Sequence, residues 1–301
     1  MPAFPSLRPG PARLAAGLLA AARWSVTAAV VAFLVIPVFL SVLAGLTVNY
    51  MRGPSSGLTL RWLAQVWGSY QGSVFLSLQV ALWTLVLTLL LGVPAAYALA
   101  RSQGRVARGI EELLVLPVAL PGLASALALL SVYGGFGAFR QSLWFIVVGH
   151  VVFTLPFMVR PVAAVWSGIG LRTLEEGAAS LGAGFVRRFI GVALPNARQG
   201  IAAGALAVIT LSLGEFNLTW MLHTPDTKTL PVGLADTYAS LRIELGSAYT
   251  LLFLLISLPL MVAAQWLAGA GRRSVRTPRR GARHASGTIG GASFSSLEKR
   301  T

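Results

Sequence analysis

The residue types that most often do chemistry in proteins are sparse in this chain. Among 301 residues there are three histidines (His150, His223 and His284), nine acidic residues and no cysteine. The histidines form no metal-site spacing, and the lack of cysteine excludes disulfides, thiol catalysis and thiolate metal ligands. The only lysines, Lys228 and Lys299, follow no glycine-rich run, so the chain has no nucleotide-binding P-loop. We therefore expect no catalytic residues, no metal, no cofactor and no enzyme activity.

The stretch from Glu175 to Gly200, EEGAASLGAGFVRRFIGVALPNARQG, has a pattern suited to contact with another protein. We expect Glu175 and Glu176 to open a helix, because acidic side chains complement the positive N-terminal end of its macrodipole. The small residues 177–180 would let another surface approach closely. Gly182 can adopt backbone angles that other residues avoid, which suits a turn between two short helices.

The second half of this stretch is expected to form an amphipathic helix. An apolar stripe is formed by Phe185, Phe189 and Val192, which recur at helical spacing, and Arg187 and Arg188 lie off it. Pro195 is expected to end this helix, because proline lacks the amide donor. Such a connector could lie on a bilayer or dock on a partner, and the spacing of the whole stretch favours docking.

The elements that carry these residues are expected to be membrane-spanning helices. Hydrophobic residues make up 55% of the chain and charged residues 11%, with a mean hydropathy of +0.74, which is too apolar for an ordinary water-soluble domain. Most of the long uncharged intervals exceed the roughly 20 residues that a spanning helix needs. These intervals are Trp24 to Met51, Trp62 to Ala100, Leu113 to Tyr133 and beyond, Gln141 to Val159, Ile201 to Gly214, and Leu245 to Gly271.

The intervals predict an all-α integral membrane protein with six transmembrane helices. Continuous apolar runs satisfy backbone groups within each helix, whereas barrel strands would alternate apolar and polar residues. Pro117 and Pro121 are expected to kink the third helix. The mixed aromatic and apolar segment 58–72 is expected to lie along the outer membrane surface.

The distribution of charge predicts the orientation. With both termini in the cytoplasm, inner segments hold 18 of the 24 Lys and Arg residues, and outer segments hold five. Basic excess marks the cytoplasmic face, so we expect both termini inside. The net charge of +15 is therefore assigned to the membrane rather than to nucleic acid.

These features divide the chain into three parts. Residues 1–22 are expected to form a cytoplasmic lead, and residues 23–269 the transmembrane domain with a cytoplasmic loop at about 166–200. Residues 270–301, rich in Gly, Ser and Arg, are expected to be a disordered basic tail.

The cytoplasmic loop resembles the EAA loop of transmembrane subunits of binding-protein-dependent ATP-binding cassette importers. That motif reads E-A-A, three residues, G, nine residues, I, one residue, L-P. The matching positions here are Glu176, Ala178, Gly182, Leu194 and Pro195. Gly177 stands where the motif has Ala, which weakens the first helix by about 1 kcal/mol, and Val192 conservatively replaces Ile. The resemblance extends over roughly Trp62 to Trp266.

The resemblance implies a type I importer architecture and a set of partners. Two permease subunits, identical or different, form the path in the bacterial cytoplasmic (inner) membrane. A cytoplasmic ATP-binding cassette ATPase dimer receives the loops, and an extracytoplasmic solute-binding protein delivers solute. Glu176 and Gly182 are the foremost coupling candidates, with Ala178, Leu194 and Pro195 as supporting geometry.

The translocation path is expected to involve Glu215, together with Ser212 and Asn217. A charge in mid-helix costs about 2.5 to 3.5 kcal/mol on insertion scales and normally faces the bundle interior. Glu215 could line the path for a cationic solute, pair with a basic group of the partner permease, or make a packed hydrogen bond between helices. The C-terminal third of the chain looks most like the polyamine-type branch, which implies a polyamine-like solute. Iron(III), thiamine, an aminoalkylphosphonate, and sulfate or molybdate are the alternatives.

Rival function classes remain at this stage. An ion-coupled secondary transporter would need polar residues at helix breaks and often internal repeats. Glu215, His150 and the proline kinks are a thin supply for that role. A membrane-embedded lipid enzyme would need an acid–base or metal constellation, and a purely structural membrane protein is the third rival.

Overall fold

The computed structural model describes residues 11–102 and 104–270, with side chains described for 17–102 and 104–266. Within these residues the chain is helical, with one isolated bridge between Thr47 and Leu58 and no strand. The all-α prediction is confirmed. The basic tail beyond Ala270 and residues 1–10 of the N-terminal lead lie outside the described residues.

Five helical segments in the described part of the chain are long and apolar enough to cross a membrane. They are α1 (Pro11–Leu46, apolar from Gly17), α2 (Arg61–Arg101), α6 (Leu143–Gly168), the continuous segment Phe185–Gly214, and α12 (Ile243–Ala270). A sixth span results if α3 (Arg105–Ala119) and α4 (Gly122–Tyr133) count as one, although they are bent by 104°. The six predicted crossings are met only with this bent pair included.

The bend between α3 and α4 occurs at the second of the two prolines. Pro121 is the N-cap of α4, and Leu120 before it is extended (φ −83°, ψ 142°). A residue that precedes proline is pushed out of the helical region by the proline ring, so α3 stops there. Pro117 stays inside α3. The sequence predicted a kink here, but not one this sharp.

The segment 58–72 does not form a separate surface element. Helix α2 starts at Arg61 and runs for 41 residues without a break. Val66 is fully buried, and the Tyr70 ring packs edge-on against Tyr249 of α12, with centroids 5.0 Å apart. Trp62, Leu63 and Tyr70 are partly buried against the cluster that holds Val66 and Tyr249. Leu58, Leu60 and Trp67 of the same segment are exposed.

Helices α2, α6 and α9 (Leu194–Gly214) form the centre of the bundle. Glycines on α9 allow its close approach to α6. A Cβ atom on Gly200 would lie 2.7 Å from the Pro161 carbonyl oxygen, and one on Gly204 would lie 2.9 Å from the Met158 sulfur. Small residues let membrane helices pack at short range, where van der Waals contact drives association.

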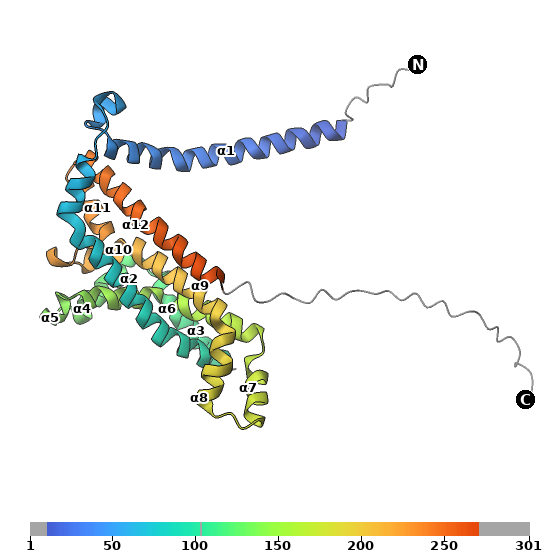
Figure 1. Ribbon diagram of the computed structural model, residues 1–301. Helices are drawn as coiled ribbons and strands as arrows, with labels where there is room; N and C mark the ends of the chain where they lie inside the picture. The colour runs from blue at the N-terminus through green and yellow to red at the C-terminus, as the bar shows by residue number, and fades with distance from the viewer. Residues whose placement is uncertain (1–10, 103, 271–301) are drawn as a thin grey trace, which may run out of the picture.

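Helix α1 separates from this bundle along most of its length (Figure 1). Its last turns pack on α12, where a Cβ on Gly45 would lie 2.5 Å from the Ala248 nitrogen. None of the most apolar window of α1 is buried. The helix starts by Pro11, well before the Trp24 start that the sequence predicted.

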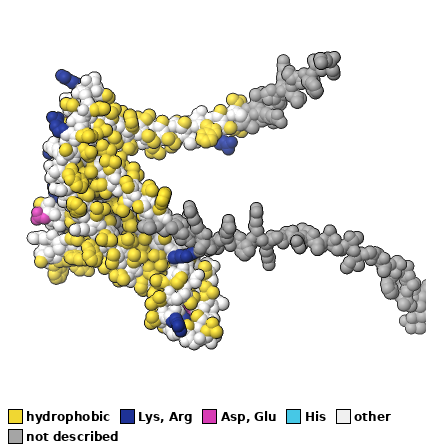
Figure 2. Space-filling view, viewed as in Figure 1, with side chains coloured by type: hydrophobic (Ala, Val, Ile, Leu, Met, Phe, Trp, Pro, Cys, Tyr) yellow, Lys and Arg dark blue, Asp and Glu magenta, His cyan; other side chains and the backbone are white. Residues whose placement is uncertain are grey.

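The two ends of the bundle differ. At one end, the hairpin end, α7 (Leu171–Ser180) and α8 (Phe185–Arg188) project beyond the spans (Figure 1). The opposite end carries η1 (Tyr50–Ser56), α5 (Gly137–Arg140), α10 (Asn217–Leu222), η3 (Pro225–Thr227) and α11 (Leu230–Ala239). The face in Figure 2 shows hydrophobic side chains over the spans, with Lys and Arg at the two ends. This is the pattern of a protein surrounded by lipid at its middle.

Candidate functional site

The hairpin, residues 171–193, is built around a glycine turn. Gly182 has φ +83°. The Gly182 amide donates to the Ala179 carbonyl at 2.9 Å, and the Ala183 amide donates to the Ala178 carbonyl at 3.1 Å. This pair of bonds is a Schellman motif, in which glycine takes the left-handed position just after the helix. The predicted turn at Gly182 is confirmed, and Ala178 supplies one of its acceptors.

The tip and outer side of the hairpin expose apolar side chains. Leu181 at the tip is 90% exposed. The other exposed apolar side chains of this surface are Leu174, Phe185, Val186 and Ile190. The small residues Gly177, Ala179 and Ser180 are also exposed. Apolar side chains gathered on a segment that projects beyond the spans mark a contact surface for another molecule.

The two acidic residues of the hairpin do not open its first helix, as the sequence predicted. Helix α7 starts at Leu171, so its first turn holds no acidic residue and Glu175 and Glu176 lie in the second turn. The macrodipole argument for these residues was therefore wrong. Glu176 is exposed and accepts from Arg172 Nε at 2.9 Å within its own helix. Glu175 is buried, at 1% exposure.

The buried Glu175 meets two residues of α2 that sequence reasoning missed. Its Oε1 accepts from the Tyr97 hydroxyl at 2.5 Å, and its Oε2 accepts from Arg101 Nη1 at 2.7 Å. Arg101 Nη1 also donates to the Tyr97 oxygen at 2.7 Å. One signal was available in the sequence: Glu175 lies one helical turn after Leu171, on a face that is otherwise apolar.

Pro195 does not end a helix, as the sequence predicted, but lies in the first turn of α9. The chain passes from α8 through a π-helical turn, η2 (Phe189–Ala193), directly into α9, with Pro195 in its first turn. Proline has no amide hydrogen and its ring crowds the carbonyl four residues earlier, so the wider π turn accommodates it without breaking the helix. The buried Trp166 indole donates to the Ala193 carbonyl at 2.8 Å and fixes this turn to α6. Leu194 is half-buried and Pro195 is exposed.

A second polar cluster lies where the span of α9 breaks. His150 of α6 is buried, with Nδ1 2.8 Å from the Ser212 hydroxyl and Nε2 2.7 Å from the Thr219 hydroxyl. Glu215 follows the last residue of α9 and accepts from the Leu218 and Thr219 amides, each at 2.9 Å. The Thr219 hydroxyl also donates to Glu215 Oε2 at 2.9 Å. The Glu215 carboxylate is thus occupied within its own turn as a cap for α10.

The three predicted path residues have different surroundings. Ser212 is buried against His150, Glu215 is half-buried, and Asn217 is exposed. Asn217 faces the start of α4, where a Cβ on Gly122 would lie 3.1 Å from the Asn217 Cβ. The break in α9–α10 therefore meets the break in α3–α4.

A groove of about 430 Å³ runs along α9 next to Phe157. Its lining from α9 is Gln199, Ala203, Leu206, Ala207, Thr210 and Leu211. These positions follow helical spacing along α9, whose last residue, Gly214, is exposed. The groove is mostly apolar, with Gln199 and Thr210 as its polar groups.

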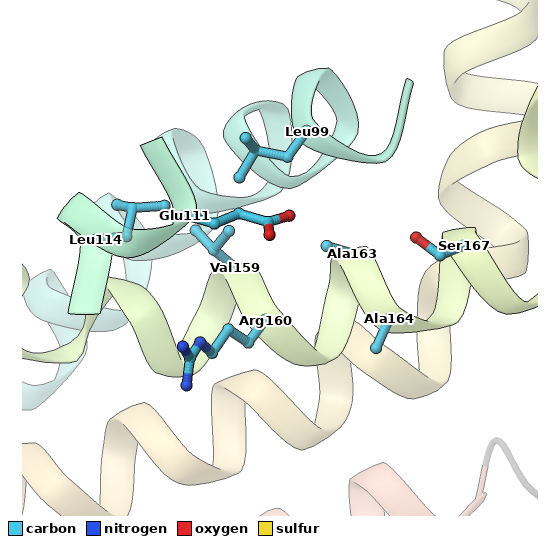
Figure 3. A pocket seen from close by; sticks show the side chains of 8 residues that line it. All are labelled: Leu99, Glu111, Leu114, Val159, Arg160, Ala163, Ala164 and Ser167. Atoms are coloured by element: carbon cyan, nitrogen blue, oxygen red, sulfur yellow. The ribbon is translucent and has the colours of Figure 1, made fainter. Parts of the chain in front are cut away.

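A smaller cleft of about 240 Å³ lies between α2, α3 and α6 (Figure 3). Glu111 of α3 and Arg160 of α6 line it, together with Leu99, Leu114, Val159, Ala163, Ala164 and Ser167. In Figure 3 the Arg160 side chain extends away from Glu111. The cleft holds one acidic and one basic group, so its charge selects no class of solute.

The chain is similar in sequence to membrane components of known transport systems. Residues 89–277 match the family described as binding-protein-dependent transport system inner membrane component. The molybdenum transport system permease protein ModB of Mycobacterium tuberculosis is 30% identical over 257 residues, covering 79% of this chain and 94% of its own length.

Two further relatives either cover less of this chain or share fewer identical residues with it. ModB of Azotobacter vinelandii is 32% identical over 179 residues, covering 54% of this chain and 79% of its own length. The putative 2-aminoethylphosphonate transport system permease protein PhnV of Salmonella typhimurium is 26% identical over 258 residues, covering 85% and 95%. The polyamine expectation gains no support from these names.

Proposed function

Because the chain belongs to the family of binding-protein-dependent transport system inner membrane components, we propose that its hairpin couples the membrane bundle to a separate ATPase. Members of this family are membrane components of transport systems, so the chain is a multi-pass permease and not itself an enzyme. The exposed apolar surface of the hairpin carries the proposal. Leu174, Leu181, Phe185, Val186 and Ile190 are all exposed on one short projecting segment, which favours a partner or lipid that covers them.

The shape of the hairpin favours a protein partner over lipid. It projects past the end of α12 in Figure 1 instead of folding back across the spans. Exposed small residues on α7 permit close approach of a second surface, and the exposed Glu176 and Arg172 add polar contacts at its edge. A groove in an ATPase offers both kinds of contact to a segment that projects beyond the spans.

The proposed mechanism is mechanical. Closure of an ATPase pair around ATP pushes the hairpin of each permease subunit, and the bundles rock between inward and outward access. Gly182 holds the turn in shape, Glu176 and Ala178 present the contact face, and Leu194 and Pro195 join the hairpin to α9. The hairpin faces the cytoplasm of a bacterium in this proposal, both termini lie inside, and the opposite end receives a solute-binding protein. A second permease subunit, identical or different, completes the path.

We propose a small oxyanion as the solute, with molybdate and 2-aminoethylphosphonate as the candidates. The proposal takes its chemistry from the molybdenum and 2-aminoethylphosphonate systems of the relatives. The site geometry agrees with it, because the Glu215 carboxylate already accepts bonds from the amides of α10 and is not presented as a ligand for a cation. The groove on α9, together with the exposed Asn217 beyond the end of that helix, is the proposed path surface.

Co-purification tests the coupling proposal. The tagged chain, extracted from its native membrane in mild detergent, is expected to bring down a P-loop ATPase in stoichiometric amount. Proteoliposomes of that complex with its binding protein are expected to take up labelled molybdate or 2-aminoethylphosphonate only with ATP inside. Reproducible absence of the ATPase, together with uptake that collapses with the ion gradient, would support a secondary transporter and overturn the proposal.

A further inference from the structure

We infer that Tyr97, Arg101 and Glu175 form a clamp that makes α7 and α2 move as one body, so that they act as positioning residues for coupling. The inference rests on the proposed coupling function. It assigns to this cluster the step from the hairpin to the membrane spans.

The burial of Glu175 is the first observation. Its side chain is 2% exposed, while that of its neighbour Glu176 is 64% exposed. A carboxylate is rarely buried unless it is paired, because removing it from water is costly. Both oxygens of Glu175 are paired, and both partners belong to α2.

The bonds form a closed triangle. Tyr97 and Arg101 lie four residues apart on one face of α2, and each bonds to Glu175 and to the other. Sliding or rotating α7 against α2 would leave a buried carboxylate without partners, which is strongly unfavourable. The cluster therefore resists relative motion of the two helices more than apolar contact would.

The Tyr97 ring extends the clamp to the rest of the hairpin base. It makes edge-on contacts with Phe189 at 4.9 Å, Trp166 at 5.7 Å and Phe185 at 6.0 Å between ring centroids. Aromatic pairs in such geometry add to the stabilisation from buried area. One residue of α2 thus holds α7, the α8–η2 segment and the end of α6 together.

Helix α2 can carry a displacement across the bundle. It runs for 41 residues and packs against α6, α9, α11 and α12. In the N-terminal half of α2, the Ser77 hydroxyl accepts a bond from the Leu230 amide of α11 at 2.7 Å. The Arg172–Glu176 pair, in contrast, joins two residues of α7 and links it to no span.

The test uses the whole complex purified with its ATPase and reconstituted in liposomes. Because the chain has no cysteine, cysteines replacing the exposed Thr173 on α7 and the exposed Leu90 on α2 provide the only pair of thiol sites for spin labels within this chain. The distance between the labels is measured without nucleotide and with ATP, in the otherwise unchanged protein and with Glu175→Gln or Tyr97→Phe. Uptake of molybdate and of 2-aminoethylphosphonate per ATP hydrolysed is measured in parallel. Tyr50→Phe, which removes a hydroxyl at the opposite end, is the matched control.

The clamp predicts one narrow distance that ATP leaves unchanged in the parent protein and in Tyr50→Phe. In Glu175→Gln and Tyr97→Phe the distance should shift or broaden on ATP binding, and uptake per ATP should fall about tenfold, the scale of one lost hydrogen bond to a charge. A parent distance that changes with ATP, or variants that keep both the distance and the uptake ratio, would overturn the clamp. A parent complex without any ATPase would instead contradict the proposed function.

Discussion

The hairpin and the break between α9 and α10 each hold a carboxylate in a polar cluster. They differ in how much apolar surface they expose. At the break, His150, Ser212, Thr219 and Glu215 satisfy one another and leave little polar surface free. At the hairpin, both oxygens of Glu175 are also paired, yet apolar side chains elsewhere on the hairpin, such as Leu181 and Val186, are exposed. The polar cluster at the break therefore stabilises the bundle itself, whereas the exposed apolar surface of the hairpin is suited to contact with a partner.

The largest loss of stability is expected when the His150 side chain is removed from the break between α9 and α10. His150→Ala should lower stability by about 3 kcal/mol, because it leaves a cavity, leaves the buried Ser212 hydroxyl without its partner and leaves the Thr219 hydroxyl bonded to Glu215 alone. Thermal unfolding of the purified protein in detergent measures this. His223→Ala removes a half-buried ring that donates to one carbonyl, and should cost less than about 1 kcal/mol. Equal losses for the two variants would show that the His150 cluster is not a stabilising element.

The next effect should fall on the hairpin alone. Gly182→Val forces a branched side chain into a left-handed conformation, at a cost of about 2 kcal/mol or more. Recovery of the ATPase and solute uptake should drop about tenfold or more, while the spans stay folded. The control is Gly184→Val, since Gly184 lies two residues away with an ordinary φ of −68° and open space around it. Normal uptake and ATPase recovery with Gly182→Val would count against the hairpin as the coupling element.

A substitution at the exposed hairpin tip should affect binding of the ATPase but not the stability of the fold. Leu181→Asp should weaken binding of the ATPase by about 1.5 kcal/mol, because it removes an apolar contact and places a charge in the interface. Thermal stability should change by less than about 0.5 kcal/mol, since the side chain touches little of its own chain. Leu241→Asp changes a leucine of similar exposure, 84%, at the opposite end and should leave ATPase recovery intact. Equal recovery of the ATPase with both variants would show that the exposed Leu181 does not mark the contact surface for the ATPase.

The smallest effect is expected at Glu215. Glu215→Gln keeps one acceptor for the amides of α10 but turns a donor toward the other, so stability should fall by about 1 kcal/mol. The preference between molybdate, 2-aminoethylphosphonate and a polyamine should not change, because the carboxylate serves as a cap. Competition uptake assays measure this preference. A shift toward anions in the variant would show that Glu215 faces the path after all.

The sequence predicted the parts of this account that depend on local pattern. Apolar runs located the spans, and the glycine between two short helices located the hairpin turn at Gly182. Both features follow from one segment at a time, since hydrophobic length and backbone freedom are local properties. The kink at Pro121 was predicted for the same reason, although its angle depends on how α4 packs against α10.

Features that depend on distant contacts were missed or misread. Tyr97 and Glu175 are 78 positions apart, and nothing local shows that they meet. The pairing of His150 with Ser212 is equally remote. Pro195 was read as a helix stop because the rule for proline assumes a regular α-helix, and the π turn before it removes the clash.

A single cross-linking measurement tests the central claim most directly. Leu181 is replaced by cysteine in this cysteine-free chain and coupled to a photoreactive probe in inside-out membrane vesicles. The account predicts one dominant adduct, with a P-loop ATPase, and protection of Leu181→Cys from impermeant thiol reagents added to intact cells. Labelling from outside the cell, or an adduct with lipid alone, would contradict it.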